Sequence, residues 1–153
     1  MSVQTAAGTT IGISASTPAT FDEAGYEALS FTLIGQIVDG GTHGRTYAEV
    51  THNPISSRGT QKFKGSFNEG NKTLQLGYDS DDAGQILLKT ALNSDDDYSF
   101  EVTHPNGDID WFQGKVMSLE KANPSVDSII SATVTIAITT NSAGVGIVEY
   151  LET

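Results

Sequence analysis

The chain has 153 residues, which is enough for one domain with a hydrophobic core of its own. Its net charge of -11, from 8 basic and 19 acidic residues, argues against a surface built to grip nucleic acid. It has no cysteine, which excludes disulfides and thiolate metal sites, and no apolar run approaches the length needed to cross a bilayer.

Alternating apolar and polar residues predict strands over most of the chain. Residues 1–10 have neither a basic start nor an apolar stretch, so no signal peptide is indicated and we expect synthesis in the cytoplasm. Asn106 and Gly107 predict a tight hairpin, since both residues tolerate positive φ. The predicted strands are residues 31–38, 47–51, 61–67, 73–78, 98–103, 108–120, 128–140 and 145–151.

One segment, residues 79–92, has the pattern of a helix instead. Asp79 or Ser80 can cap its start, acidic residues follow in the first turn, and Lys89 lies near its end, as the helix dipole favours. Three side chains spaced four residues apart, with two apolar residues beside them, form its predicted apolar face. One helix among about eight strands indicates a mainly β fold, a β-sandwich or barrel with one flanking helix near residues 80–92. The side chains of this predicted face are Ala83, Leu87 and Ala91, beside Ile86 and Leu88.

The longest predicted strand, residues 128–140, has two contrasting faces. One is apolar and suited to a core, and the other carries small uncharged residues with high β propensity. Exposed strands usually carry charged residues that guard their edges, and this strand has none. Two interpretations stay open: a central strand between two neighbours, or a strand sealed inside an assembly. The apolar face is Ile130, Ala132, Val134, Ile136 and Ile138, and the other is Ser131, Thr133, Thr135, Ala137 and Thr139.

The acidic segments do not match a calcium site. The loop that begins at Asp79 has Ala83 and Thr90 where two ligands belong, and a second loop, from Asn93, also lacks required positions. The three histidines follow no zinc spacing, and no serine lies in a nucleophile-elbow pattern. We therefore predict no enzyme activity, no cofactor and no metal. The histidines are His43, His52 and His104, and the pair Asp108 and Asp110 shares a strand face without a catalytic partner.

A series of segments in order along the chain resembles a known family. They are SASTPATFDEAGY at 14–26, YAEVTHNP at 47–54, KFKGSF at 62–67, TLQL at 73–76, DAGQILLK at 82–89 and VDS at 126–128. The stretch from Ile13 to Thr140 is similar to the major tail tube protein of long-tailed bacteriophages and of related gene transfer agents. Residues 141–153 match less clearly.

The resemblance implies one tail-tube-like domain over residues 1–153, with residues 1–10 and 141–153 as candidate flexible segments. In this family, six copies close a ring whose inner strands form a continuous β-barrel, and rings stack into a tube for DNA ejection. The implied partners are other copies of the chain, the tape measure protein, and terminator and baseplate proteins. The protein would reside in the virion tail, DNA would pass without specific binding, and no membrane is involved.

Charge is distributed unevenly, which suggests how rings would stack. Residues 45–72 carry a net charge of +3, whereas residues 73–153 carry -10. Head-to-tail stacking joins two different surfaces of one subunit, so we expect Arg45 and Arg58 to meet acidic residues of the next ring. The alternative is that these bases only keep two loops soluble. The acidic candidates are Asp95, Asp96 and Asp97, and the candidates for the lumen or the ring-closing strand are Ser131, Thr133, Thr135 and Thr139.

A different class of function stays open beside the tube. A β-sandwich of this size can be a binding module that recognises a carbohydrate or a cell-surface receptor. Such modules generally display aromatic residues on loops, whereas Trp111 and most phenylalanines here fall at alternating strand positions.

Overall fold

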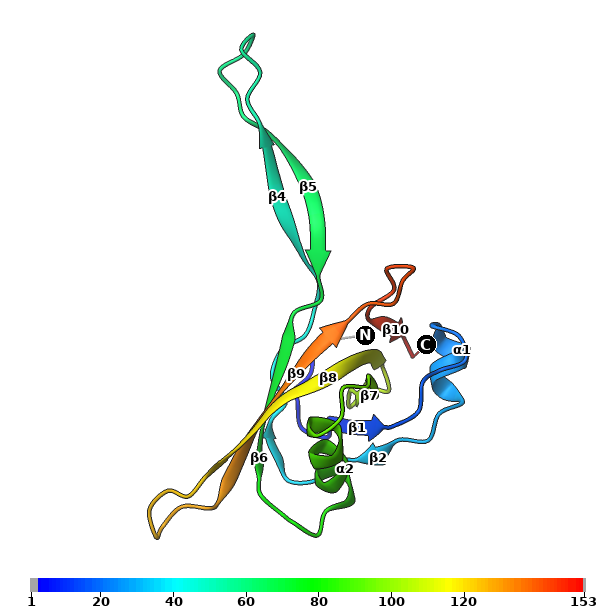
Figure 1. Cartoon of the computed structure of the whole chain (residues 1–153), viewed down its shortest axis with the longest axis vertical. Coiled ribbons are helices and arrows are strands. Elements are labelled where there is room, and N and C mark those ends of the chain that lie inside the picture. Colours follow the sequence, from blue (N-terminus) through cyan, green and yellow to red (C-terminus); the bar gives the residue numbers. More distant parts are fainter. Residues whose placement is uncertain (1–2, 153) are drawn as a thin grey trace.

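A computed structural model describes residues 3–152. Within them the chain forms an eight-stranded sheet, a separate two-stranded hairpin and two helices (Figure 1). The strands are β1 Thr10–Ser14, β2 Thr32–Leu33, β3 Ile37–Asp39, β4 Thr46–His52, β5 Gln61–Asn68, β6 Asn71–Gly77, β7 Tyr98–Thr103, β8 Ile109–Ala122, β9 Ser131–Thr139 and β10 Val148–Tyr150, and the helices are α1 Glu23–Glu27 and α2 Ala83–Leu92. No helix in this part of the chain is long and apolar enough to cross a membrane. The mainly β class is confirmed.

The large sheet has the order β2-β1-β7-β8-β9-β6-β3, and neighbouring strands run antiparallel. The sheet curls into part of a barrel (Figure 1). β10 pairs with the first residues of β8, which β9 does not reach. The strand β9 lies between β8 and β6, so within one chain the interpretation as a central strand is correct.

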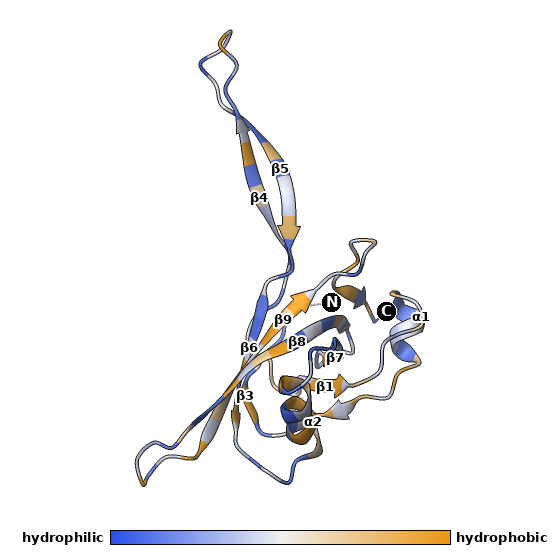
Figure 2. Ribbon diagram, in the orientation of Figure 1, coloured by the Kyte–Doolittle hydropathy of each residue, from blue (hydrophilic) through white to orange (hydrophobic). Residues whose placement is uncertain are grey.

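The core lies between the inner face of the curled sheet and α2. Side chains of β9 alternate between buried and half-buried along its whole length, as the sequence pattern predicts. Leu88 of α2 is fully buried against this face. Figure 2 colours the hydrophobic residues of α2 and of the sheet orange. The buried members of β9 and β6 are Ala132, Val134, Ile136 and Ile138, with Leu74 and Leu76.

The helix α2 begins later than predicted. Its N-cap is Asp82, whose carboxylate accepts the backbone N–H groups of Gln85 and of Gly35, each at 3.0 Å. A helix that begins at Ala83 buries Gly84, Leu88 and Ala91. Leu87, predicted to be buried, is only half-buried, although it packs against the core. Gly84 sets this orientation, because a Cβ there would overlap the backbone of residues 33 and 34.

Two further predictions need correction. The single strand expected at residues 31–38 is two short strands, because Gln36 adopts a left-handed conformation with φ of 62° and interrupts the pairing. The helix α1 was not predicted. Asp22 caps it through the N–H of Gly25 at 2.9 Å, and its buried Tyr26 stacks on Trp111 with ring centroids 5.9 Å apart.

Candidate functional site: an exposed arm, its base and an uncharged sheet face

The strands β4 and β5 form a hairpin that projects away from the rest of the molecule (Figure 1). We call residues 46–68 the arm. All residues of β4 and most of β5 are exposed. An isolated two-stranded hairpin is only marginally stable in water, so the arm needs support from outside the domain.

One face of the arm is apolar and uncovered. Val50 pairs with Phe63, and Tyr47 pairs with Phe67, with ring centroids of the second pair 5.7 Å apart. The exposed fractions are 48% for Val50, 56% for Phe63 and 41% for Tyr47, while Ile55 at the tip is fully exposed. An apolar surface of this kind, contiguous and on a protruding element, is typical of a protein interface.

The arm also carries more basic than acidic residues. Residues 46–68 hold three basic residues and one acidic residue. Lys62 forms an ion pair with Glu49 at 3.3 Å, and Lys64 lies 4.8 Å above the ring of Tyr47. Arg58 stands in the loop at the tip of the arm and is exposed. The arm therefore has an apolar face and an excess of positive charge.

The base of the arm is held by Arg45, one of the two predicted ring-to-ring contacts. Its Nε donates to Oε1 of Glu69 at 2.6 Å, and its guanidinium lies 3.8 Å from the centroid of Phe67. Hydrogen bonds to Tyr47 and to Glu69 raise the pKa of Arg45. Glu69 is buried and packs closely against Gly146. Arg45 is thus engaged within its own chain, and Arg58 is the base left facing solvent.

The acidic candidates lie in the loop between α2 and β7. Asp95 and Asp96 are exposed, whereas Asp97 is half-buried and forms an ion pair with Lys115 of β8. A second hairpin, β8–β9, projects on the side of the molecule opposite the arm (Figure 1). Its exposed apolar residues are Met117, Val126, Ile129 and Ile130.

The predicted lumen residues share one face of the sheet. Ser131, Thr133, Thr135 and Thr139 are all half-buried on the face of β9 that points away from the core. On β6, Thr73 pairs with Thr135 and Gln75 pairs with Thr133, and both are exposed. On β8 the paired residues include one base, Lys115, and one acid, Glu120. This face is polar with almost no net charge.

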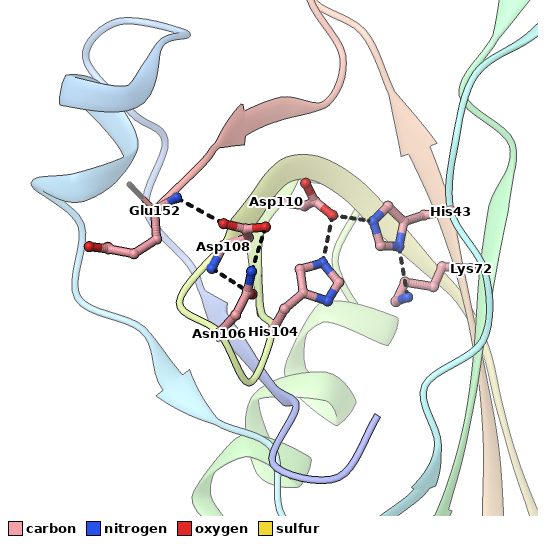
Figure 3. Close-up of polar contacts among 7 residues, drawn as sticks. All are labelled: His43, Lys72, His104, Asn106, Asp108, Asp110 and Glu152. Atoms are coloured by element: carbon pink, nitrogen blue, oxygen red, sulfur yellow. Dashed lines mark hydrogen bonds and ion pairs between the residues drawn. The ribbon is translucent and has the colours of Figure 1, made fainter. Parts of the chain in front are cut away.

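A polar cluster at the base of the arm was missed by sequence reasoning (Figure 3). His43 Nε2 lies 2.7 Å and His104 Nε2 lies 3.1 Å from the same oxygen, Oδ2 of Asp110, and Lys72 Nζ lies 3.0 Å from His43 Nδ1. Burial alone would raise the pKa of Asp110, but the hydrogen bonds from the two histidines lower it. The available signal was the period-two row Lys72, Leu74 and Leu76, which places a lysine in phase with core residues.

The same cluster shows that Asp108 and Asp110 are not a catalytic dyad. Asp108 accepts from Asn106 at 2.9 Å and from the N–H of Glu152 at 2.8 Å, so the two carboxylates serve different partners. Among residues 3–152, no group of three or more acidic, histidine or cysteine side chains is arranged to hold a metal ion. The cluster therefore connects segments of the fold and has no geometry for catalysis.

Comparison with known proteins supports a tube protein. The family model described as lambda phage tail tube protein matches residues 31–144. Comparison with curated proteins gives no significant match. Among solved structures, the fold is similar to that of the SPP1 tail tube, with a TM-score of 0.63 and 14% identity over 94% of this chain and 77% of that chain.

Two structures from contractile injection systems are also similar. A chain of the PVC sheath/tube terminator of an extracellular contractile injection system gives a TM-score of 0.66 and 10% identity, over 99% of each chain. A chain of the anti-feeding prophage baseplate gives a TM-score of 0.61 and 9% identity, over 89% of this chain and 92% of that chain. At these identities the similarity concerns the fold. The family match covers most of the chain. The protein therefore belongs to the lambda phage tail tube protein family, whose members are structural components of phage tails and not enzymes.

Proposed function

We propose that six copies of this chain close into a ring, that rings stack into the tail tube, and that the tube conducts DNA during ejection. The family membership supports the tube, and the bare apolar face of the arm is the observation that carries the assembly. The tape measure protein would occupy the growing tube, and terminator and baseplate proteins would bind its ends.

The arm provides the main contact between subunits in this proposal. Its face with Val50 and Phe63 is apolar and exposed, and it belongs to an element without a core of its own. Docking on another copy would bury this face and supply the support that the hairpin lacks. The β8–β9 hairpin on the opposite side exposes a second set of apolar residues. In the proposed tube, one protruding surface of each subunit would face each neighbouring ring.

We assign the uncharged face of β9 to the lumen. Its hydroxyl groups, together with the amide of Gln75, offer a passing DNA duplex no concentrated positive charge to bind. The net charge of -11 on each subunit adds repulsion of the phosphates. DNA would therefore move along the tube without being held.

The test is electron microscopy of the purified protein, with variants that alter the arm face alone. We expect sixfold rings or tubes from the wild type and loss of stacking when Val50→Ser and Phe63→Ser are combined. The melting temperature should hardly change, because these side chains contact little of the body. Ile86→Ser is the matched control, since Ile86 on α2 is 49% exposed but lies outside the arm. A wild-type protein that stays monomeric at every concentration, or a double variant that stacks normally, would contradict the proposal.

A further inference from the structure

The contacts of the polar cluster at the base of the arm (Figure 3) indicate where its protons lie. Oδ2 of Asp110 is acceptor to both His43 and His104, so each histidine has its proton on Nε2. That leaves the Nδ1 lone pair of His43 as the acceptor for the ammonium of Lys72, at 3.0 Å. The result is a chain in which a lysine cation donates to a neutral histidine and that histidine donates to a carboxylate.

This arrangement cannot accept a further proton on His43. A protonated His43 carries N–H on both nitrogens, and its Nδ1–H would then point at the ammonium of Lys72. Lys72 is 2% exposed, so little water reaches its ammonium to weaken the repulsion. Asp110 lies 2.7 Å from His43 Nε2 and would attract the new charge, so protonation sets this attraction against the repulsion from Lys72.

The position of His43 gives this conflict a mechanical consequence. His43 lies in the segment of residues 40–45, which joins β3 to the arm and makes no strand pairing. On either side, Gly41 and Gly44 have positive φ, so the backbone of the segment follows no regular structure that would hold it alone. Asp110 belongs to β8, in the body of the sheet. The His43–Asp110 hydrogen bond therefore fastens the entrance of the arm to the body.

We propose that His43 is a pH-sensitive link between the arm and the body. Neutral His43 joins residues 40–45 to Asp110 and Lys72 through hydrogen bonds. Protonation of His43 breaks this link, releases the segment and makes the base of the arm more mobile. The charged groups around the cluster include both signs, with more acidic than basic residues. They are Asp39 at the end of β3, Arg45 and Glu69 at the base of the arm, Lys72 on β6, His104 at the end of β7, Asp110 on β8 and Glu149 on β10. Burial lowers the pKa of Lys72 from 10.5 to about 8, against the attraction of Asp110 and Asp39, so the ammonium is still present at neutral pH.

The inference concerns a single chain and does not depend on ring formation. It is tested on dilute monomeric protein by the distance between spin labels on the arm and the body. The chain has no cysteine, so Ser57→Cys at the tip of the arm and Thr90→Cys on α2 accept labels without competition. We expect the distance distribution to broaden as the pH falls from about 7.5 to about 5.5, the range in which histidine takes up its proton.

Three variants distinguish the pH-sensitive link from a general effect of acid. His43→Gln cannot be protonated and should show no change with pH, and Lys72→Met removes the repulsion and should also lose the response. His52→Gln is the matched control, since His52 is exposed on β4 and should leave the response intact. A distribution that stays constant or narrows in acid, or a response that survives in His43→Gln, would overturn the proposal.

A second measurement keeps the test decisive if a variant fails to fold. Nitrogen NMR of the histidine rings in the wild-type protein reports which nitrogen carries the proton. We expect the Nε2–H form for His43 at about pH 7.5, and its conversion to imidazolium together with the broadening of the label distances. An Nδ1–H form at neutral pH would show that Lys72 does not donate to His43, and would overturn the proposal.

Discussion

Lys72 is a lysine with almost no exposed surface, and its surroundings explain how it is tolerated. It lies on the core face of β6 beside Leu74, and its ammonium reaches His43 at the edge of the core. Burial lowers its pKa to about 8, although Asp110 and Asp39 attract the charge. The lysine therefore makes the free energy of unfolding depend on pH between about pH 8 and 10.5.

The sign of this sensitivity follows from the two pKa values. In the unfolded chain Lys72 keeps its proton up to about pH 10.5, whereas in the folded chain it loses the proton near pH 8. Between these values the unfolded state binds more protons, so the destabilising contribution of Lys72 is full below pH 8 and fades as the pH rises. We expect the free energy of unfolding to rise relative to Lys72→Met by at most about 1.4 kcal/mol per pH unit in this window.

Urea denaturation of both proteins at intervals between pH 7 and 10.5 measures this difference. Comparison with the variant cancels other groups that titrate in this window, such as Tyr26, whose ordinary pKa of 10.0 applies to the unfolded chain and is raised by burial to about 12 in the folded one. If the free energies of unfolding of the two proteins change in parallel with pH, then titration of Lys72 does not affect stability in this window.

At the scale of single elements, most strand positions were predictable, β1 excepted, and helix details were not. The strand predicted at residues 128–140 is β9, residues 131–139, and period-two alternation identified its buried face, because a strand has only two faces. Ile130, predicted on that face, precedes the strand and is 49% exposed. The helix α2 was located correctly, but its buried side depends on where the first turn begins, and several acidic residues compete for the cap. Asp82 prevails because it also accepts the N–H of Gly35, a contact 47 residues away that no local pattern contains.

The corrected helix face leads to a prediction about two adjacent leucines. Leu88 is fully buried in the core, whereas Leu87 is half-buried. We expect Leu88→Ala to lower the free energy of unfolding by about 2–5 kcal/mol, since it leaves a cavity, and Leu87→Ala to lower it clearly less. Chemical denaturation of the pair, with circular dichroism to confirm the native fold, is the measurement. Equal losses, or a larger loss for Leu87→Ala, would mean that the helix presents the other face to the sheet.

For the whole molecule, the sequence predicted the family and the charge asymmetry but not the shape. Alternation identified both strands of the arm, yet nothing local distinguishes a hairpin that packs on the sheet from one that projects beyond it. The residues predicted to line the lumen and those predicted to join rings therefore differ in how the structure arranges them. The four β9 residues share one face, whereas Arg45 is bound to Glu69 and only Arg58 stands free at the tip.

The exposed position of Arg58 directs the test of stacking by charge. We expect Arg58→Glu to shorten tubes at low salt by opposing the acidic loop at Asp95 and Asp96 of the next ring, and added salt to shorten wild-type tubes. A single exposed ion pair contributes little, but the proposed ring of six would repeat it six times. Tube length is counted by negative-stain microscopy, with Lys89→Glu on α2 as a control for the same charge change away from both hairpins. Tubes of unchanged length in Arg58→Glu at every salt concentration would leave the apolar face as the sole stacking contact.

The pairing of distant strands sets the order in which the protein forms in time. The arm is a local hairpin and can form in about 1–10 μs once its residues are made. The sheet must wait, because Thr10 of β1 pairs with Thr103 of β7, and Asn71 of β6 pairs with Ala137 of β9. At a synthesis rate of roughly 5–20 residues per second, each nascent arm stands without its body for several seconds. Through that interval the charges of Lys62 and Lys64, which oppose pairing between strand edges, keep the arms of neighbouring nascent chains apart.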